Sequence, residues 1–483
     1  MIKKILSLLG VTLLAAGAVF AWNVARLPTV AAHSAPIEAV APLAADPAVL
    51  AAAVRIPTVS YDDADVIDHG PFDRWMAFVQ EAFPRTHQRL KWEIINEYSF
   101  LYTWSGQSVD ATPILFTAHY DVVPVDDNGE WHHPPFSGQL ADGYVWGRGS
   151  MDDKAAVISI LSATEKLLEE GFVPHRTLVF AFGHDEEIGG RSGAAKLAAQ
   201  LEARNIRPEW MLDEGMVITD GVISVIDQPI ALIGVAEKGY LTLELYVEGE
   251  GGHTSSPPHH TAAGVLSAAV ARLENSPMSA RLDGAAAAMF DRLTPAMPVV
   301  PKALFANRWL FEPLLIKQLE GKTSTNAMIR TTAAVTQLKG SNKENVLPRL
   351  ASATVNFRLL PGDSVDDVIR YVKAAVADPQ VKVRVIGEAT EASKVSDVSG
   401  KGFASIESAV NSVYPEVLTA PALLIATTDS KHYAPLTSNI YRFRPLWVTP
   451  ADVPRFHGVN ERLAVENYQR MVTFFYQLMR KVE

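Results

Sequence analysis

The chain has 483 residues, a formal net charge of −11, 48% hydrophobic residues and no cysteine. This length allows two or more domains, each with a sizeable apolar core. The acidic balance, without any basic block, argues against a nucleic acid as partner. The lack of cysteine excludes disulfides, thiolate ligands and cysteine nucleophiles, so a metal site must use His, Asp and Glu.

The N-terminal segment is apolar. Lys3 and Lys4 precede an uncharged run from Ile5 to Trp22, whose length lies between that of a signal-peptide core and that of a membrane-spanning helix. We therefore predict a signal peptide or membrane anchor over 1–26, with the body exported: anchored outside the cytoplasm, or secreted if the segment is cleaved. A buried helix is the alternative, although such a helix would normally show a polar face. The Ala- and Pro-rich stretch 27–46 is typical of a tether.

Three short apolar runs end at charged or imidazole side chains. They are Ile114–Thr117, Leu178–Phe182 and Trp210–Leu212, and a helix-period segment, Asp153–Glu169, separates the first two. This alternation is typical of an α/β sheet, in which sites form beyond the carboxyl ends of the strands. The polar residues that follow the runs are His119, Asp121, Glu186, Glu187 and Asp213.

A further acidic pair, Asp152–Asp153, follows a glycine-rich turn and begins the helical segment. Taken alone, the pair could simply cap that helix. Together with the imidazole and the other carboxylates, however, it favours a divalent metal site, because these are the ligands such ions take in proteins without cysteine.

The pattern changes after residue 230. Tyr240–Glu248 alternates apolar and polar residues, as do Val335–Lys339 and Ala353–Leu359, which is typical of half-solvated antiparallel strands. We therefore predict an α+β domain over 231–385, inserted between two parts of a catalytic domain, 47–230 and 386–483. The stretch 276–325 is poorly patterned and is assigned only to the insert.

Six motifs in order resemble one enzyme family, the dinuclear zinc amidohydrolases. This family includes carboxypeptidase S, Gly-X carboxypeptidase, aminoacylase and succinyl-diaminopimelate desuccinylase. The resemblance is strongest to the carboxypeptidase S and Gly-X carboxypeptidase branch, through IPTVSYDD, EWHHPPFSG, TDSKHY and FHGVNER. It implies an α/β catalytic domain with a mostly parallel central sheet flanked by helices, interrupted by a lid or dimerisation domain. The six motifs are HYDVVP, WGRGSMDDK, DEE, LDEG, GGHTSSP and HGVNE.

The resemblance also implies a ligand set for two zinc ions per chain, with Co²⁺ or Mn²⁺ as substitutes. Asp152 would bridge the ions, one of which takes His119 and Asp213, while the other takes Glu187 and His457. In the two catalytic roles, Asp121 would fix the tautomer of His119, and Glu186 would act as general base.

Four further residues are expected to contact substrate. The resemblance implies that His253 stabilises the oxyanion, from its own chain or across a homodimer formed through the lid. Arg358 would clamp a free carboxylate, for which a planar fork is suited, and Asn345 would assist; a solvated arginine at a strand end is the bland alternative for Arg358. His432 is the alternative to His457 as metal ligand; the HGVNE motif favours His457 for that role, with His432 nearer the substrate.

We therefore expect a zinc-dependent hydrolase of C-terminal peptide bonds or N-acyl amino acids, acting on substrates with a free carboxylate. A non-catalytic binding module on the same fold is the alternative. A serine hydrolase is excluded, because the chain has no nucleophile-elbow motif.

Overall fold

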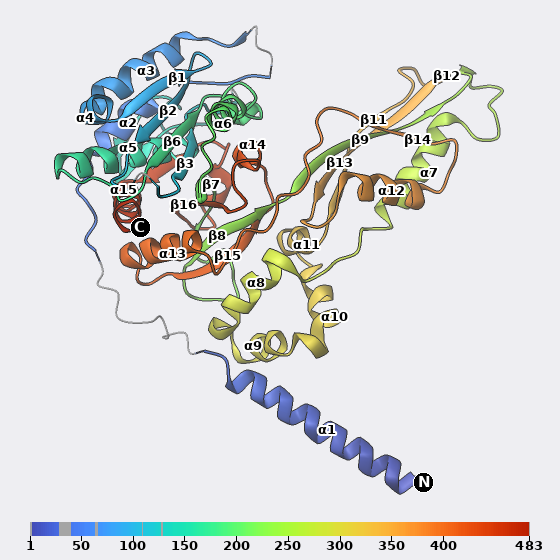
Figure 1. Cartoon of the computed structure of the whole chain (residues 1–483). Helices are drawn as coiled ribbons and strands as arrows, with labels where there is room; N and C mark the ends of the chain where they lie inside the picture. The colour runs from blue at the N-terminus through green and yellow to red at the C-terminus, as the bar shows by residue number, and fades with distance from the viewer. Residues whose placement is uncertain (1, 29–39, 63–65, 109, 127–128, 483) are drawn as a thin grey trace.

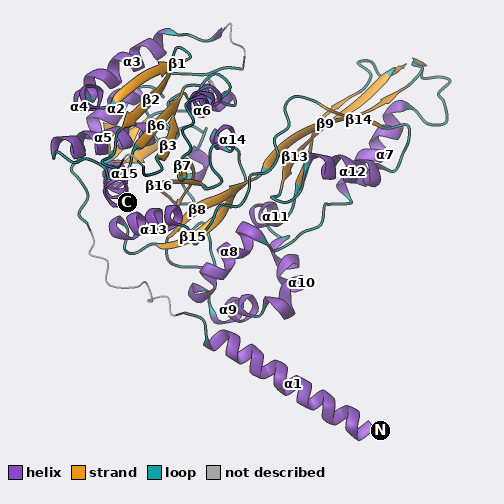
Figure 2. Ribbon diagram, viewed as in Figure 1, coloured by secondary structure: helices purple, strands orange, loops and turns teal. Residues whose placement is uncertain are grey.

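The computed structural model describes residues 2–28, 40–62, 66–108, 110–126 and 129–482 (Figure 1). Most of the predicted tether, 29–39, lies outside the described residues. The chain forms a large sheet packed between helices and a smaller domain that projects from it (Figure 2).

The large sheet has eight strands in the order β1-β2-β6-β3-β7-β16-β8-β15. Its centre is parallel, because β3 pairs in parallel with both β6 and β7, and β7 with β16, whereas β1 and β2 add an antiparallel edge. This confirms the predicted α/β fold with a mostly parallel central sheet. The strands are β1 (Lys91–Ile95), β2 (Ser99–Trp104), β3 (Ile114–His119), β6 (Leu178–Gly183), β7 (Trp210–Thr219), β8 (Ile230–Glu237), β15 (Leu418–Leu424) and β16 (Ile440–Val448).

Helices cover both faces of this sheet, which explains why β3 and β6 are buried at every position. Phe116 and Phe180 point to one face and pack in the core that α5 and α15 complete, whereas Leu115 and Val179 point to the other face, toward α6. The helices of this domain are α2 (Pro47–Val54), α3 (Gly70–Ala82), α4 (Pro84–Arg89), α5 (Lys154–Glu169), α6 (Ala194–Ala203), α13 (Lys401–Val413), α14 (Ser430–Tyr433) and α15 (Val465–Lys481). A small sheet of β17 (Arg462–Ala464), β5 (Tyr144–Trp146) and β4 (Gln139–Ala141) lies beside them.

The projecting domain is an antiparallel sheet in the order β11-β13-β9-β14, packed against α7 and α12. The side chains of β9 alternate between buried and partly exposed, as its sequence predicts. β8 runs into β9 with only Lys238 between them, so residues 231–237 belong to the large sheet. Its elements are β9 (Gly239–Glu248), β10 (Gly252–His253), α7 (Ala262–Glu274), β11 (Thr332–Lys339), β12 (Val346–Leu347), β13 (Leu350–Leu359), α12 (Val365–Val376) and β14 (Lys382–Val385).

The segment that the sequence left unplaced is helical and packs under the large sheet. Met289, Phe290 and Leu293 of its first helix share a core with Leu232 of β8 and Ala422 of β15. In Figure 1 these yellow helices lie below β8 and β15. They are α8 (Gly284–Leu293), α9 (Val299–Ala306), α10 (Arg308–Leu319) and α11 (Thr323–Ile329).

The N-terminal helix α1 (Ile2–Ala25) extends away from the body beside α9 (Figure 1). Within the residues that the structure describes, no helix combines the length and the apolar character needed to cross a membrane.

Candidate metal centre

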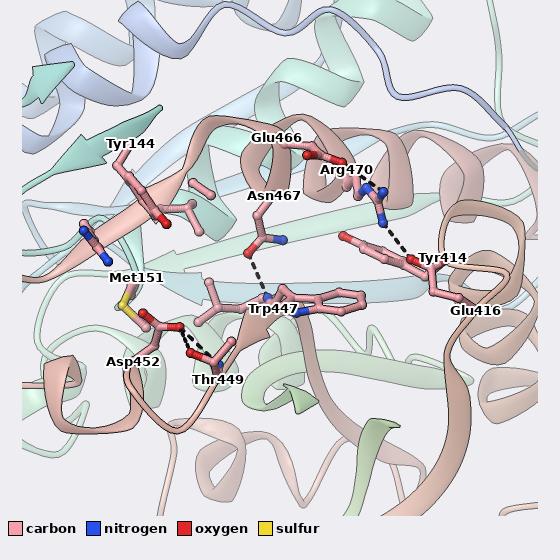
Figure 3. A pocket seen from close by; sticks show the side chains of 14 residues that line it. Tyr144, Met151, Tyr414, Glu416, Trp447, Thr449, Asp452, Glu466, Asn467 and Arg470 are labelled. Carbon is pink, nitrogen blue, oxygen red and sulfur yellow. Dashed lines mark hydrogen bonds and ion pairs between the residues drawn. The ribbon is translucent and has the colours of Figure 1, made fainter. Parts of the chain in front are cut away.

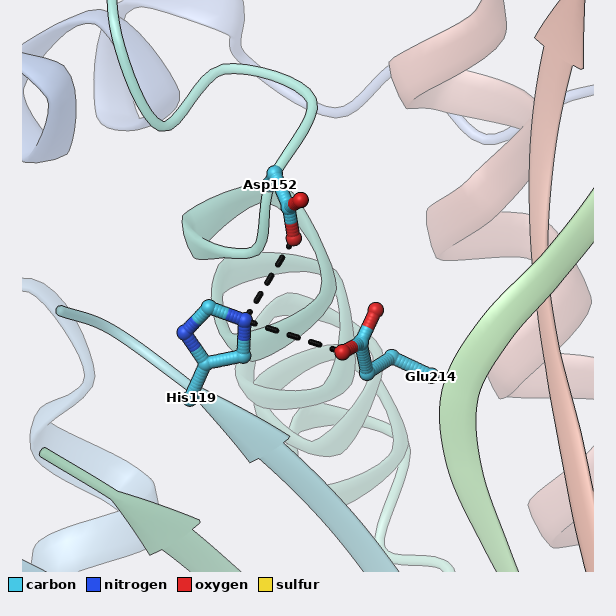
Figure 4. Close-up of side chains that lie close together, drawn as sticks. All are labelled: His119, Asp152 and Glu214. Carbon is cyan, nitrogen blue, oxygen red and sulfur yellow. Dashed lines mark ion pairs between the residues drawn. The ribbon is translucent and has the colours of Figure 1, made fainter. Parts of the chain in front are cut away.

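His119, the last residue of β3, lies at the centre of a buried group of carboxylates. Its Nε2 is 3.4 Å from Oδ1 of Asp152 and 3.8 Å from Oε1 of Glu214 (Figure 4). The same nitrogen is 3.9 Å from Oε2 of Glu186. This nitrogen is buried and has no hydrogen-bond partner among the described residues. Since buried polar atoms are rarely left without a partner, we expect this nitrogen to bind a ligand.

His457 approaches the same carboxylate from the other side. Its Nε2 lies 3.3 Å from Oδ2 of Asp152 and 3.3 Å from Oε2 of Glu187. Asp152 therefore presents one oxygen to each of two imidazoles, and this is the geometry that a carboxylate bridging two ions requires.

The donor atoms fit divalent cations. Three groups bring their ligand atoms within 4.8 Å of one another: His119, Asp152 and Glu214; His119, Glu186 and Glu187; Asp152, Glu187 and His457. Burial raises the pKa of Glu186, Glu187 and Glu214, and nearby carboxylates raise it further. Added positive charge would relieve both effects, and nitrogen with carboxylate oxygen is the donor set that zinc accepts.

Asp121 orients His119 and the loop after β6. Its Oδ1 is 3.2 Å from Nδ1 of His119, and its two oxygens accept the backbone N–H groups of Glu186 and Glu187, each at 3.1 Å. Burial opposes its charge, but the hydrogen bonds from His119, Ser60 and the backbone outweigh burial and keep the pKa of Asp121 below its usual value. One carboxylate thus positions groups from two strand ends.

Glu461 and Arg148 connect Asp152 with His457. Oε1 of Glu461 accepts the backbone N–H groups of Gly149 at 2.9 Å and Met151 at 2.7 Å, and it lies 3.3 Å from that of Asp152. Arg148 donates to the other oxygen of Glu461 at 2.6 Å and to the carbonyl of His457 at 2.9 Å. Sequence reasoning missed this pair, although Glu461 ends the HGVNE motif.

Arg444 of β16 is a buried cation among the acids. Its Nη1 is 3.0 Å from Asp152, 2.5 Å from Asp153 and 3.2 Å from Glu214. Sequence reasoning missed it too. The available signal was the presence of Arg442 and Arg444, two residues apart, in an apolar strand, because charge in such a strand is rarely buried without a partner.

Glu214, rather than its neighbour Asp213, points into the cluster. Asp213 accepts a hydrogen bond from Thr117 at 2.6 Å, and none of the three groups of clustered ligand atoms includes it. β7 (Trp210–Thr219) is irregular at these acids, because Asp213 and Met216 pair with the consecutive residues Arg442 and Phe443 of β16. Glu214 joins the clustered ligand atoms. The assignment of Asp213 stays a prediction, since its Oδ2 is buried without a hydrogen-bond partner among the described residues.

Two other histidines lie near the cluster without joining those groups. Nε2 of His432 is 2.9 Å from the carbonyl of Gly189, just after the loop of Glu186 and Glu187. His184 bonds the hydroxyl of Ser99 at 2.7 Å. Between His432 and His457, it is His457 that the structure places against Asp152.

Apart from His432, the predicted substrate residues are spread over the projecting domain. His253 pairs with Val346 of β12, and the carbonyl of Asn345 accepts the N–H of Thr254. β12 lies at the end of this domain far from the large sheet (Figure 1), so the chain does not bring His253 or Asn345 to its own cluster. Arg358 lies at the near end of β13, opposite Tyr240; its guanidinium is 4.8 Å from the centre of that ring.

A separate cavity of about 390 Å³ lies behind the loop of Asp152. None of the residues predicted for the site lines it. Figure 3 shows its walls, where Trp447 donates its backbone N–H to Asn467 and Arg470 pairs with Glu416. Met151, whose backbone N–H bonds Glu461, lines this cavity.

A buried histidine at the carboxyl end of β3, with carboxylates and a second imidazole around it, suits a metal-dependent hydrolase. The model of the Peptidase family M20/M25/M40 matches residues 115–481, and the chain belongs to this family. It is 41% identical over 438 residues to "Probable carboxypeptidase S-like 2" of Dictyostelium discoideum, covering 90% of this chain and 84% of that protein.

A second relative is an "N-fatty-acyl-amino acid synthase/hydrolase" of Danio rerio, 40% identical over 434 residues and covering 88% of this chain and 84% of that protein. Among solved structures, an M20 family metallo-carboxypeptidase of Sulfolobus solfataricus matches with a TM-score of 0.65 and 17% identity, over 89% of this chain and 97% of that one. The latter likeness concerns the fold alone.

The choice between Asp213 and Glu214 can be tested by metal content. We expect Glu214→Gln to lose close to one of two bound metal equivalents, because it removes a charged ligand and preserves the volume of the side chain. Asp213→Asn is the matched control and should retain both. Elemental analysis of the two purified variants measures this; loss of metal from Asp213→Asn alone would restore Asp213 as the ligand.

Proposed function

We propose that the chain hydrolyses C-terminal peptide bonds or N-acyl amino acids with the help of two divalent ions, zinc being the expected metal. The observation that carries this proposal is the position of Asp152, with one oxygen toward His119 and the other toward His457. The names of the two relatives, a carboxypeptidase and an acyl-amino-acid hydrolase, support the same reaction, since both break an amide bond.

His119 and Glu214 would hold one ion and Glu187 and His457 the other, with Asp152 shared. Bound divalent ions supply Lewis acidity: they ease the ionisation of water and stabilise negative charge on a carbonyl oxygen. The chain's part is to fix five ligands from distant segments, which it does through the contacts of Asp121, Glu461 and Arg444. The completeness of this set disfavours a non-catalytic binding module.

Glu186 is the proposed general base. It lies in the cluster beside His119, and its pKa is raised well above the ordinary value, mainly by burial. A carboxylate of raised pKa can take a proton from water and then give it to the leaving nitrogen. Asp121 positions Glu186 through the backbone N–H of that residue.

Arg358 is proposed to bind the free carboxylate of the substrate. Its Nη1 is buried and lacks a hydrogen-bond partner among the described residues, while its ring contact with Tyr240 fixes the plane of the guanidinium. His432 of α14, which bonds the carbonyl of Gly189, is also proposed to contact the substrate. His253, with Asn345 beside it, is proposed to act in the site of a second copy, because both lie far from their own cluster.

The segment 1–26 supports a proposal of export. Its two lysines and the uncharged run Ile5–Trp22 are those of a targeting segment. Whether the segment remains attached decides between an anchored and a secreted enzyme.

Metal-dependent hydrolysis is the direct test of the proposed function. Purified protein is incubated with dipeptides and N-acyl amino acids, before and after removal of metal by a chelator. We expect turnover of at least one substrate class, loss of turnover in the metal-free protein, and recovery on adding zinc or cobalt. Full activity of the metal-free protein would contradict the proposal.

The role of Glu186 is tested by Glu186→Gln, which keeps the size of the side chain and removes the base. We expect a loss of turnover of about 10²–10⁴-fold, the range for general-base catalysis, with metal content nearly unchanged. Glu187→Gln is the matched control and should lose metal. The reverse pattern in the two variants would exchange their roles.

The role of His253 is tested by complementation. An oxyanion donor contributes about 10²–10³-fold in turnover, so His253→Ala alone should lose that much and keep its metal. Mixing it with Glu186→Gln should restore part of the activity once subunits exchange, since one hybrid site then has both residues. Subunit exchange without recovery would show that His253 does not act across chains.

A further inference from the structure

The helices α9 and α10 expose a set of large apolar side chains to solvent. On α10, Trp309, Leu310 and Leu314 are 58%, 50% and 52% exposed, while Leu315 and Leu319 are buried on the opposite side. At the start of α9, Val299 and Val300 are 81% and 69% exposed. We call Val299, Val300, Trp309, Leu310 and Leu314 the α9–α10 apolar face.

A buried asparagine joins this face to the N-terminal helix. Asn307, between α9 and α10, accepts a hydrogen bond from Nδ2 of Asn23 at 3.1 Å and one from the indole of Trp309 at 3.4 Å. Its own amide donates to the carbonyl of Phe20 at 3.4 Å, and the Phe20 ring meets Phe311 edge-on at 6.2 Å. The C-terminal end of α1 is therefore fixed beside Trp309.

The described part of α1 is itself apolar and exposed, with Leu14 and Trp22 at 77% and 67%. The run from Ile5 to Trp22 contains no charged residue, so this helix has no polar face to turn to water. A protein partner typically covers one side of a helix, whereas lipid can surround it. Because α1 and the α9–α10 apolar face adjoin at Asn307, one occupant would cover both.

The charges around the face suit a lipid surface. Residues 299–322 contain three lysines, Lys302, Lys317 and Lys322, in a chain of net charge −11. The arginine and one of the two glutamates of this stretch are already paired, Arg308 with Asp291 and Glu320 with Arg330. Tryptophan is enriched at the boundary between lipid and water. Trp309 bonds Asn307, and the exposed Trp22 is next to Asn23 in the sequence of α1. Exposed apolar patches with a polar rim mark such binding sites.

We propose that the α9–α10 apolar face is a lipid-docking surface, which lies on the same bilayer as α1. The apolar side chains of α10 enter the interfacial layer and the lysines contact anionic head groups. Since α8 packs between these helices and the strands β8 and β15, docking would hold that edge of the large sheet toward the membrane. The α9–α10 apolar face would then be a second membrane contact that orients the catalytic domain, in addition to α1.

The lack of native cysteine allows a direct test in the full-length chain. Leu310→Cys is labelled with a polarity-sensitive thiol-reactive dye, and Leu338→Cys, on β11 and similarly exposed in the wild type, is the matched control. Both proteins are bound to vesicles of phosphatidylcholine with phosphatidylglycerol. We expect a blue shift and loss of iodide quenching at position 310, with an unchanged, water-like signal at position 338.

Each other outcome overturns the proposal. A water-like dye at position 310 on vesicle-bound protein means that α1 binds alone, and failure to bind these vesicles means that neither surface is lipid-directed. A blue shift without vesicles that grows with protein concentration assigns the face to a second copy.

As a second measurement, Trp309→Ser with Leu314→Ser should weaken vesicle co-sedimentation while hydrolysis of a soluble substrate is retained, which shows that the variant is folded. Leu338→Ser is its control and should bind as wild type does. Unchanged vesicle binding by the double variant would also contradict the proposal.

Discussion

The whole centre depends on keeping several carboxylates ionised in a place where water cannot solvate them. Asp152, Glu186, Glu187 and Glu214 gather within reach of two imidazoles, and burial raises the pKa of the three glutamates. Such a group is unstable unless positive charge is supplied. Arg444 supplies positive charge to these acids. Nε2 of His119 and Oε1 of Glu187 still lack a hydrogen-bond partner among the described residues, so the cluster suits further cations.

This constraint explains why residues that are not themselves proposed ligands hold the ligands in place. Asp152 lies in a loop, and a loop alone would not hold a carboxylate midway between two histidines. Glu461 fixes that loop through its backbone N–H groups, and Arg148 extends the contact to the carbonyl of His457. Ligands about three hundred residues apart thus share one buried ion pair. Breaking the ion pair of Arg148 with Glu461 would therefore displace both Asp152 and His457.

The sequence predicted the sheet and most of the side chains that gather around His119, because both follow from local patterns. An apolar run that stops at His119 or Glu187 identifies a strand end, and parallel strands bring such ends to one edge. It assigned Asp213 as a ligand, whereas the structure brings Glu214 into the cluster, and that difference depends on which side chain of β7 turns toward the centre. Arg444 escaped notice because its partners come from other elements. The helices α8–α11 also lacked a signal, since their apolar residues are divided between the core under β8 and an exposed face.

The joint between the domains explains why the predicted substrate residues separate. β8 continues into β9 through Lys238, whose buried amine donates to the carbonyls of Ala327 and Arg330 and so fastens the end of α11 to the joint; burial lowers the pKa of Lys238 to about 7. Arg358 lies beside this fixed point and stays near the catalytic domain whatever the far end does. His253 lies on β10, which pairs with β12 at the opposite end of the projecting domain, far from the metal centre of its own chain. The proposed catalytic role for both residues would therefore use two copies of the chain, each contributing a different end of the same domain.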